Sequence, residues 1–161
     1  MEERRKIKQI EKYDEYGNLE YTIIPNYKVH ENFMTKNELD FYKYLISAII
    51  NIREKHQLKL TIFSQVALNR IIDVNNNRND KLYRNICDRS IDFVLYNESN
   101  NKIHCCIELN DETHNHPERI KRDLMIEKAL KGNINIIFVE RKERYNVQEL
   151  MNEILKCTEN N

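Results

Sequence analysis

The spacing of apolar residues changes at Thr35, where a polar stretch gives way to the pattern of an amphipathic helix. From Leu39 to Ile52, apolar residues recur three or four positions apart, so they share one face of a helix that we expect to end near Lys55. The segment Thr35-Lys36-Asn37-Glu38 has the form of a capping box and marks the start of this helix. Glu38 therefore has two interpretations, as a capping carboxylate or as a functional side chain.

Shorter apolar runs in the rest of the chain predict strands, because they have strand length and are bounded by turn-forming residues. The two central runs carry apolar residues on both faces, as expected for a sheet that is covered on each side. The predicted strands cover residues 58–66, 90–96, 103–109 and 134–139. The polar stretch 67–89 is expected to be a long irregular connection, which in a small domain is usually functional or mobile.

Two more helices are predicted after the third of these strands. Pro117 and Gly132 frame the first, since proline favours the start of a helix and glycine the position just past its end. An amphipathic pattern from Val147 to Cys157 predicts the second. The expected order is helix, three strands, helix, strand, helix.

The N-terminal part of the chain has a different character. Residues 1–34 are polar and rich in tyrosine, and the turn-forming Tyr16-Gly17-Asn18 separates possible short strands at 11–16 and 19–24. At 161 residues the chain is long enough for one domain with a substantial core. We therefore expect an N-terminal extension, 1–34, followed by a single domain, 35–157.

Composition and charge limit the classes of function. Charged residues make up 32% and apolar residues 40%, as in globular proteins, and 26 basic side chains balance 26 acidic ones. A net charge of zero gives no support for strong non-specific binding to nucleic acid, although basic residues outnumber acidic ones between Arg119 and Arg144. The start lacks a secretory signal, and no apolar stretch reaches the ~20 residues that span a membrane. We expect a cytoplasmic protein.

The four cysteines show no CxxC pair. A zinc site built from His104, Cys105, Cys106 and His116 would need neighbouring strand residues to point the same way, whereas successive side chains on a strand point to opposite faces. We therefore expect reduced cysteines that help to fill the core.

Two acidic residues interrupt runs that otherwise predict buried strands. A turn centred near residue 100 would pair the strands so that Asp92 lies opposite Glu108. Opposed side chains in such a ladder have Cβ atoms roughly 4.5–5.5 Å apart, a distance at which two negative charges repel each other. A divalent cation would compensate both, and Mg²⁺ commonly binds one or two carboxylates together with water and phosphate oxygens.

The order of elements and acidic residues resembles the PD-(D/E)xK nuclease superfamily. Glu38 falls on the first helix, Asp92 on the second strand and Glu108 on the third. Three segments resemble the branch of this superfamily that contains very-short-patch repair endonucleases. They are Ile91-Asp92-Phe93-Val94-Leu95, then Ile107 to His114, and then Arg119 with Arg122-Asp123. The similarity covers about residues 35–155. It implies an α/β fold with a restriction-endonuclease-like αβββαβ core, in which helices flank a central mixed sheet.

The resemblance also implies roles for individual residues. Asp92, Glu108 and the backbone carbonyl of Leu109 would bind Mg²⁺ or Mn²⁺, and Glu38 matches the acidic residue found on the first helix of many members. His114 matches an active-site histidine and would orient or activate the attacking water. Asn110 stands where the superfamily has lysine.

Two arginines follow this motif. Arg119 and Arg122 could clamp a phosphate oxygen, because a guanidinium group suits that geometry. Arg122 and Asp123 could instead simply pair with neighbouring side chains.

The expected activity is metal-dependent hydrolysis of nucleic acid, DNA more than RNA, and many nucleases of this architecture act as homodimers. Because Asn110 replaces the lysine, the alternative is an inactive nuclease fold that binds nucleic acid or a protein partner.

Overall fold

A computed structural model describes residues 8–13, 15–17, 19–24, 29–74, 80–87, 89–110, 117–132 and 134–158. The chain divides into two compact units, Met1–Phe33 and Met34–Asn161. In the described part of the chain, no helix combines the length and apolarity needed to cross a membrane.

The first unit contains an antiparallel hairpin of β1 (Lys8–Tyr13) and β2 (Leu19–Ile24), paired from Lys8↔Ile24 to Tyr13↔Leu19. The second strand lies where the sequence predicts it. The first ends three residues earlier than predicted, since Glu15 and Tyr16 belong to the turn. Gly17 lies in this turn with φ +79°, a conformation that glycine adopts at no steric cost.

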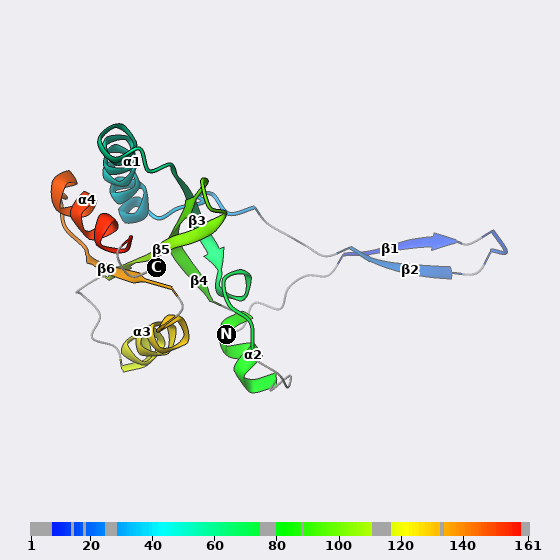
Figure 1. Ribbon diagram of the computed structural model, residues 1–161. Helices are drawn as coiled ribbons and strands as arrows, with labels where there is room; N and C mark the ends of the chain where they lie inside the picture. Colours follow the sequence, from blue (N-terminus) through cyan, green and yellow to red (C-terminus); the bar gives the residue numbers. More distant parts are fainter. Residues whose placement is uncertain are drawn as a thin grey trace. The chain divides into compact units, whose positions relative to one another are not determined.

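The second unit is an α/β fold built on a mixed sheet (Figure 1). Among the described residues the sheet has four strands in the order β3-β4-β5-β6. The strands β3, β4 and β5 are antiparallel to their neighbours, whereas β6 runs parallel to β5. Their bounds are β3 Leu60–Ala67, β4 Ser90–Asn97, β5 Lys102–Asn110 and β6 Ile136–Glu140. The predicted strand ends agree with these to within two residues.

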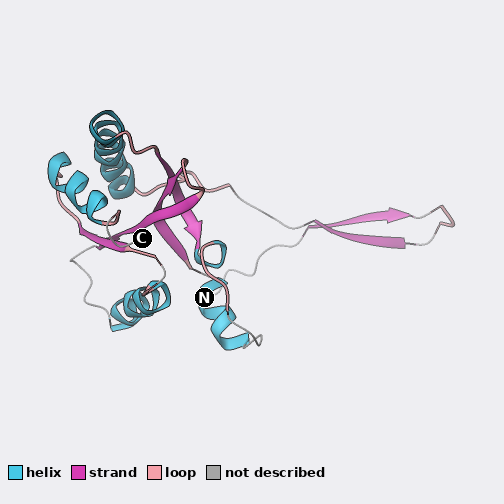
Figure 2. Ribbon diagram, viewed as in Figure 1, coloured by secondary structure: helices cyan, strands magenta, loops and turns pink. Residues whose placement is uncertain are grey.

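Helices cover both faces of this sheet, as the apolar character of its central strands predicts (Figure 2). The first core cluster lies between the sheet and the helices α1 (Lys36–His56) and α4 (Val147–Lys156). The second core cluster lies between the opposite face and the helices α2 (Asp80–Cys87) and α3 (Pro117–Leu130). Gly132 follows α3 with φ +82°, in agreement with its predicted role past the helix end.

The prediction of an irregular connection over residues 67–89 is wrong. A short 3-10 helix, η1 (Leu68–Arg70), follows β3, and α2 precedes β4. Leu68 and Ile86 are buried together in the second core cluster, and this contact outweighs the polar composition of the segment. The order of elements therefore contains a helix that the sequence pattern does not reveal, because α2 has only eight residues.

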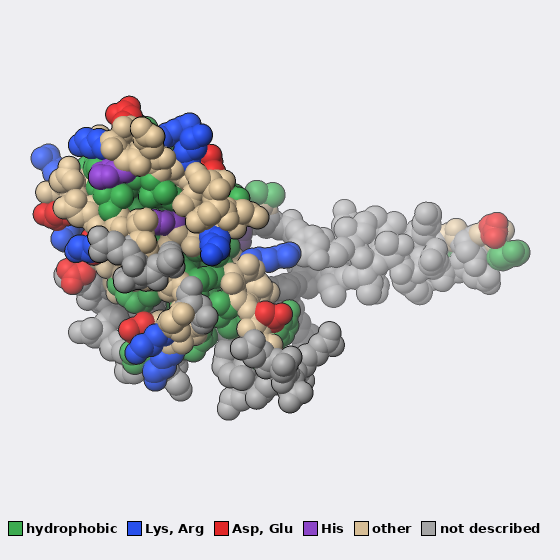
Figure 3. All heavy atoms as spheres, in the orientation of Figure 1, with side chains coloured by type: hydrophobic (Ala, Val, Ile, Leu, Met, Phe, Trp, Pro, Cys, Tyr) green, Lys and Arg blue, Asp and Glu red, His purple; other side chains and the backbone are tan. Residues whose placement is uncertain are grey.

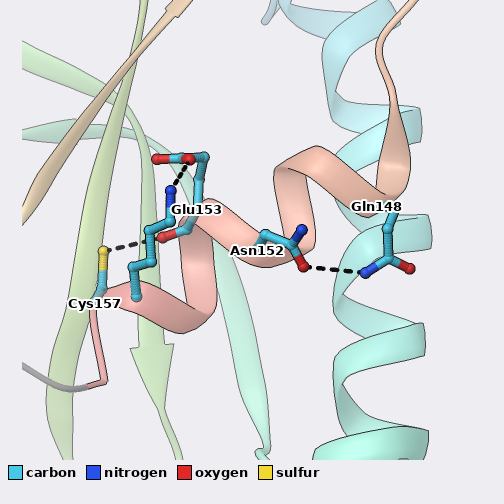
Figure 4. A network of polar contacts seen from close by, with 5 residues as sticks. Gln148, Asn152, Glu153 and Cys157 are labelled. Atoms are coloured by element: carbon cyan, nitrogen blue, oxygen red, sulfur yellow. Dashed lines mark hydrogen bonds and ion pairs between the residues drawn. The ribbon is translucent and has the colours of Figure 1, made fainter.

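Polar contacts on α4 illustrate how its exposed side is stabilised (Figure 4). Gln148 Nε2 donates to Asn152 Oδ1 (3.1 Å), and Lys156 Nζ lies 2.5 Å from Glu153 Oε1. Pairs at these spacings contribute only a few tenths of a kcal/mol each, roughly 0.2–0.5 kcal/mol. The position of α4 is therefore determined chiefly by its buried residues, Leu150, Met151 and Ile154.

Basic and acidic side chains of the described residues are interspersed on the face drawn in Figure 3. This mixture agrees with the zero net charge of the chain. Recognition of a polyanion on this face would thus depend on local contacts rather than on a broad positive field.

Candidate metal site on the central strands

The pairing of β4 with β5 has the register that the sequence predicts. Phe93↔Ile107, Val94↔Cys106 and Leu95↔Cys105 are partners, and continuing this ladder by one position brings Asp92 opposite Glu108. Closer to the turn the register shifts by one residue, because His104 forms a bulge opposite Leu95 and Tyr96. The register at the turn therefore differs by one residue from the register near Phe93. Because the bulge lies between the two, the predicted alignment of Asp92 with Glu108 is retained.

Asp92 reaches from its own strand to the next one. The backbone N–H of Leu109 donates to Asp92 Oδ2 at 2.9 Å, in a partly buried position. The carboxylate is thus held between β4 and β5, at the end of the ladder that joins them. The sequence predicts that Leu109 contributes its carbonyl oxygen to a metal, and the amide of the same residue lies directly beside this carboxylate.

Glu108 lies on the opposite strand and is only 3% exposed. Its Oε1 atom is fully buried. Cys106 lies two residues before Glu108 on the same face of β5. Burial, followed by the negative charge of Glu108, raises the pKa of Cys106 to about 12. A buried carboxylate is costly to retain as an anion, so this position fits a cation-binding role.

Glu38 fulfils the capping interpretation. Thr35 N donates to Glu38 Oε2 (2.7 Å), and Glu38 N donates to Thr35 Oγ1 (3.3 Å), which completes a capping box at the start of α1. The other carboxylate oxygen, Oε1, accepts a hydrogen bond from Gln65 Nε2 of β3 at 3.0 Å. Capping and attachment to the sheet are therefore combined in one side chain, and the role of Glu38 as a functional residue stays a prediction.

The remaining predicted site residues are described to different extents. Asn110 is the last residue of β5, half-buried, and its carbonyl oxygen accepts from the backbone N–H of Arg141 (2.9 Å). His114 lies outside the described residues. Arg119 and Arg122 belong to α3, but their side chains are not among those described. Their proposed contacts with phosphate stay predictions.

The donor set fits a hard divalent cation. The described residues contain no cluster of three or more His, Cys, Asp or Glu side chains arranged for a metal. The opposed pair of Asp92 and Glu108 supplies oxygen donors alone, and Mg²⁺ commonly takes one or two protein carboxylates and completes its shell with water and phosphate oxygens. Zinc sites more often combine Cys and His ligands, so a pair of carboxylates is more typical of Mg²⁺.

Gln65 lies next to the candidate site, and the sequence pattern does not predict this. It occupies the β3 position across from Asp92, between the pairs Ser64↔Phe93 and Val66↔Ile91. Its φ is +53°, which is unusual for any residue except glycine. The sequence carries no signal for this conformation, because asparagine or glycine would be the expected residue.

The cysteines behave as the strand pleat predicts. Cys105 packs in the first core cluster and Cys106 in the second, so the two side chains point to opposite faces of β5. A hydrogen bond with Cys157, followed by burial, raises the pKa of Cys105. Cys157 Sγ also donates to the Glu153 carbonyl oxygen at 3.5 Å (Figure 4). All four thiols are free, as expected, and Cys105, Cys106 and Cys157 fill the core clusters.

We expect Cys106 to resist alkylation in the native protein. Its pKa of about 12, against an ordinary 9.0, lowers the thiolate fraction at pH 8 about a thousandfold, and the thiolate is the reactive species. Because the pKa is raised on folding, the stabilisation due to the neutral thiol is complete below pH 9 and declines as the pH rises toward 12. Iodoacetamide labelling followed by peptide mass spectrometry should detect the half-buried Cys87 first. Equal labelling rates for Cys87 and Cys106 in the folded protein would contradict this expectation.

Comparison with known proteins identifies a family. Residues 30–157 match the family DUF2726, which is described as proteins of unknown function. The chain belongs to the DUF2726 family. The match covers the whole sheet and the helices on both of its faces, and so includes every residue of the candidate site. No curated protein and no solved structure gives a significant match to the chain.

Proposed function

We propose that this DUF2726 domain is a metal-dependent nuclease that hydrolyses phosphodiester bonds of nucleic acid, DNA more than RNA. The observation that carries the proposal is the register that opposes Asp92 and Glu108 on adjacent strands. A half-buried and a buried carboxylate at opposed positions create a strong local negative potential, which suits a divalent cation. The α/β fold with a mixed sheet supports a PD-(D/E)xK core, although the short helix α2 is added between β3 and β4.

In this proposal, different residues would hold the metal and activate the water. Asp92, Glu108 and the carbonyl oxygen of Leu109 would hold Mg²⁺ or Mn²⁺. When bound, such a cation polarises a phosphate and lowers the pKa of water. His114 would accept a proton from the attacking water, and a positioned base of this kind contributes roughly 10²–10⁴-fold.

The protein's other polar groups would act on the substrate and on the acidic residues. Arg119 or Arg122 would neutralise a phosphate oxygen. The Leu109 amide keeps Asp92 Oδ2 aimed between the two strands, which fixes the direction of the carboxylate before any substrate arrives. A homodimer would present two such sites, one for each strand of a duplex.

Cleavage assays test this proposal directly. Purified protein is incubated with single-stranded DNA, double-stranded DNA and RNA in the presence of Mn²⁺ or Mg²⁺, and in EDTA. We expect cleavage with either metal, faster on DNA than on RNA, and none in EDTA. Cleavage that continues in EDTA would contradict metal dependence, and no cleavage of any substrate would contradict nuclease activity.

Asn110 favours a second candidate, a binding module that has lost catalysis. The residue ends β5 two positions after Glu108, where the superfamily has a lysine that stabilises the charge of the transition state. An amide cannot supply a positive charge. For this candidate we expect nucleic acid or a protein partner to bind in EDTA as well as in Mn²⁺, without any cleavage product.

A further inference from the structure

Gln65 has a backbone conformation that requires an explanation. It lies inside β3 with φ +53°, in the left-handed region that disfavours side chains other than glycine, asparagine and aspartate. Such a conformation persists only where surrounding contacts maintain it, and it is most frequent at functional sites. Two other described non-glycine residues share it, Gln57 at the end of α1 and Asn101 in the β4–β5 turn. Both are at ordinary positions for it, whereas Gln65 is within a strand.

The two neighbouring strands β3 and β4 change face beside Gln65. Ile62 packs against the first core cluster and Val66 against the second, although residues four apart on a regular strand share a face. On β4, the partner of Val66 is Ile91, which lies in the second cluster, and the partner of Ser64 is Phe93, which lies in the first, so both strands change face over the row that contains Gln65 and Asp92. The Gln65 side chain is half-buried and forms hydrogen bonds with two polar partners.

These partners belong to different elements. Gln65 Nε2 donates to Glu38 Oε1 at 3.0 Å, and Gln65 Oε1 accepts from Ser90 Oγ at 3.2 Å. The first bond joins β3 to the start of α1, and the second joins it to the start of β4. Gln65 thus connects Glu38 to the strand that carries Asp92, across from Asp92 itself.

The chemistry of the amide suits an acidic site. A lysine or arginine at this position would neutralise Glu38 and compete with a cation, whereas an amide donates a hydrogen bond and leaves the negative charge in place. A carboxylate has about four acceptor positions, so Glu38 retains capacity after its bonds to Thr35 and Gln65. The strained backbone is therefore compensated by an interaction that preserves the negative charge of Glu38, bonded to the residue of β3 that lies across from Asp92.

We propose that Gln65 is a positioning residue of the candidate metal site, which acts by holding the Glu38 carboxylate at the end of the sheet where Asp92 and Glu108 are opposed. This inference rests on the proposed function. The hydrogen bond between Gln65 and Glu38 would then contribute to cation affinity, in addition to joining β3 to α1.

A double-mutant cycle measures this role through Mn²⁺ affinity rather than activity. Gln65→Asn keeps an amide and tolerates the left-handed conformation, but its side chain is too short to reach Glu38. Mn²⁺ binding is followed by electron paramagnetic resonance of the free ion in the wild type, Gln65→Asn, Glu38→Gln and the double variant. Gln57→Asn is the matched control, because Gln57 has φ +55° and lies at the far end of α1.

We expect Gln65→Asn to weaken Mn²⁺ binding about tenfold, the lower end of the effect of residues that surround the ligands of a metal site. The double variant should bind no more weakly than Glu38→Gln, since Gln65 acts through Glu38. Gln65→Gly, which adopts the backbone conformation without strain, should show the same loss, and Gln57→Asn should match the wild type.

Several outcomes would overturn the inference. Unchanged affinity in Gln65→Asn and Gln65→Gly, or losses that multiply in the double variant, would overturn the role of Gln65 alone. A wild-type protein that binds no Mn²⁺ would overturn the metal site of the proposed function, and the role of Gln65 with it. Circular dichroism and thermal melting of each variant show whether it is folded, and an affinity loss seen only in variants that fail to fold would count against the inference.

Discussion

Substitution of Glu108 by glutamine is expected to reduce DNA cleavage by about 10³-fold, because each factor of ten in rate corresponds to ~1.4 kcal/mol of transition-state stabilisation and cation-assisted catalysis supplies several kcal/mol. Glutamine has nearly the same shape as glutamate, so the buried pocket around this 3% exposed side chain stays filled. What changes is the charge. The paired substitution Asp92→Asn should have a similar effect, because an asparagine oxygen can still accept the Leu109 N–H.

The matched control is Glu98→Gln. Glu98 is an exposed acid in the β4–β5 turn, where its carboxylate accepts from Thr61 Oγ1. It lies on the same hairpin as Asp92 and Glu108 but at the opposite end. We expect this variant to cleave at the wild-type rate. Single-turnover cleavage in Mn²⁺, with the fold of each variant checked by circular dichroism, makes the comparison. Wild-type cleavage by Glu108→Gln would exclude this acid from the site.

Substitution of Phe93 by alanine is expected to lower the free energy of unfolding by about 3–5 kcal/mol, the usual cost of removing a buried aromatic ring from a core. Phe93 is fully buried in the first core cluster. Its ring lies 5.6 Å from that of Phe41 and is stacked on Tyr42 at 6.1 Å, so it connects β4 to α1. Domains are typically stable by about 5–15 kcal/mol, so this loss would remove a large part of the total.

Phe63→Ala provides the control on the adjacent strand. Phe63 is 49% exposed, and it makes an edge contact with Tyr96 at 6.1 Å. Because half of the ring already contacts solvent, we expect a loss of about 1 kcal/mol, no more than the transfer of a partly buried side chain would cost. Urea denaturation measures both variants. Similar midpoints for Phe93→Ala and Phe63→Ala would show that the first core cluster does not determine stability as proposed.

Local interactions explain why much of this fold is predictable from the sequence. The first helix begins at Lys36 because Thr35 and Glu38 satisfy each other's backbone groups, and residues three positions apart suffice to form that cap. The alignment of Asp92 with Glu108 is predictable because a hairpin register follows from its turn, even with the bulge at His104. The helix α2 was not predictable, since Ile86 becomes a core residue only when Leu68 is beside it.

The sequence by itself determined the secondary structure of the main strands and helices, the opposed acidic pair and the separation of Cys105 from Cys106 on two faces. Each follows from a periodicity or a short spacing along the chain. The tertiary structure alone decided that Glu38 reaches the sheet, through the bond from Gln65. That contact joins residues 27 positions apart and depends on a left-handed backbone that glutamine rarely adopts. No local rule favours it, because only the packing of α1 against β3 brings the two side chains together.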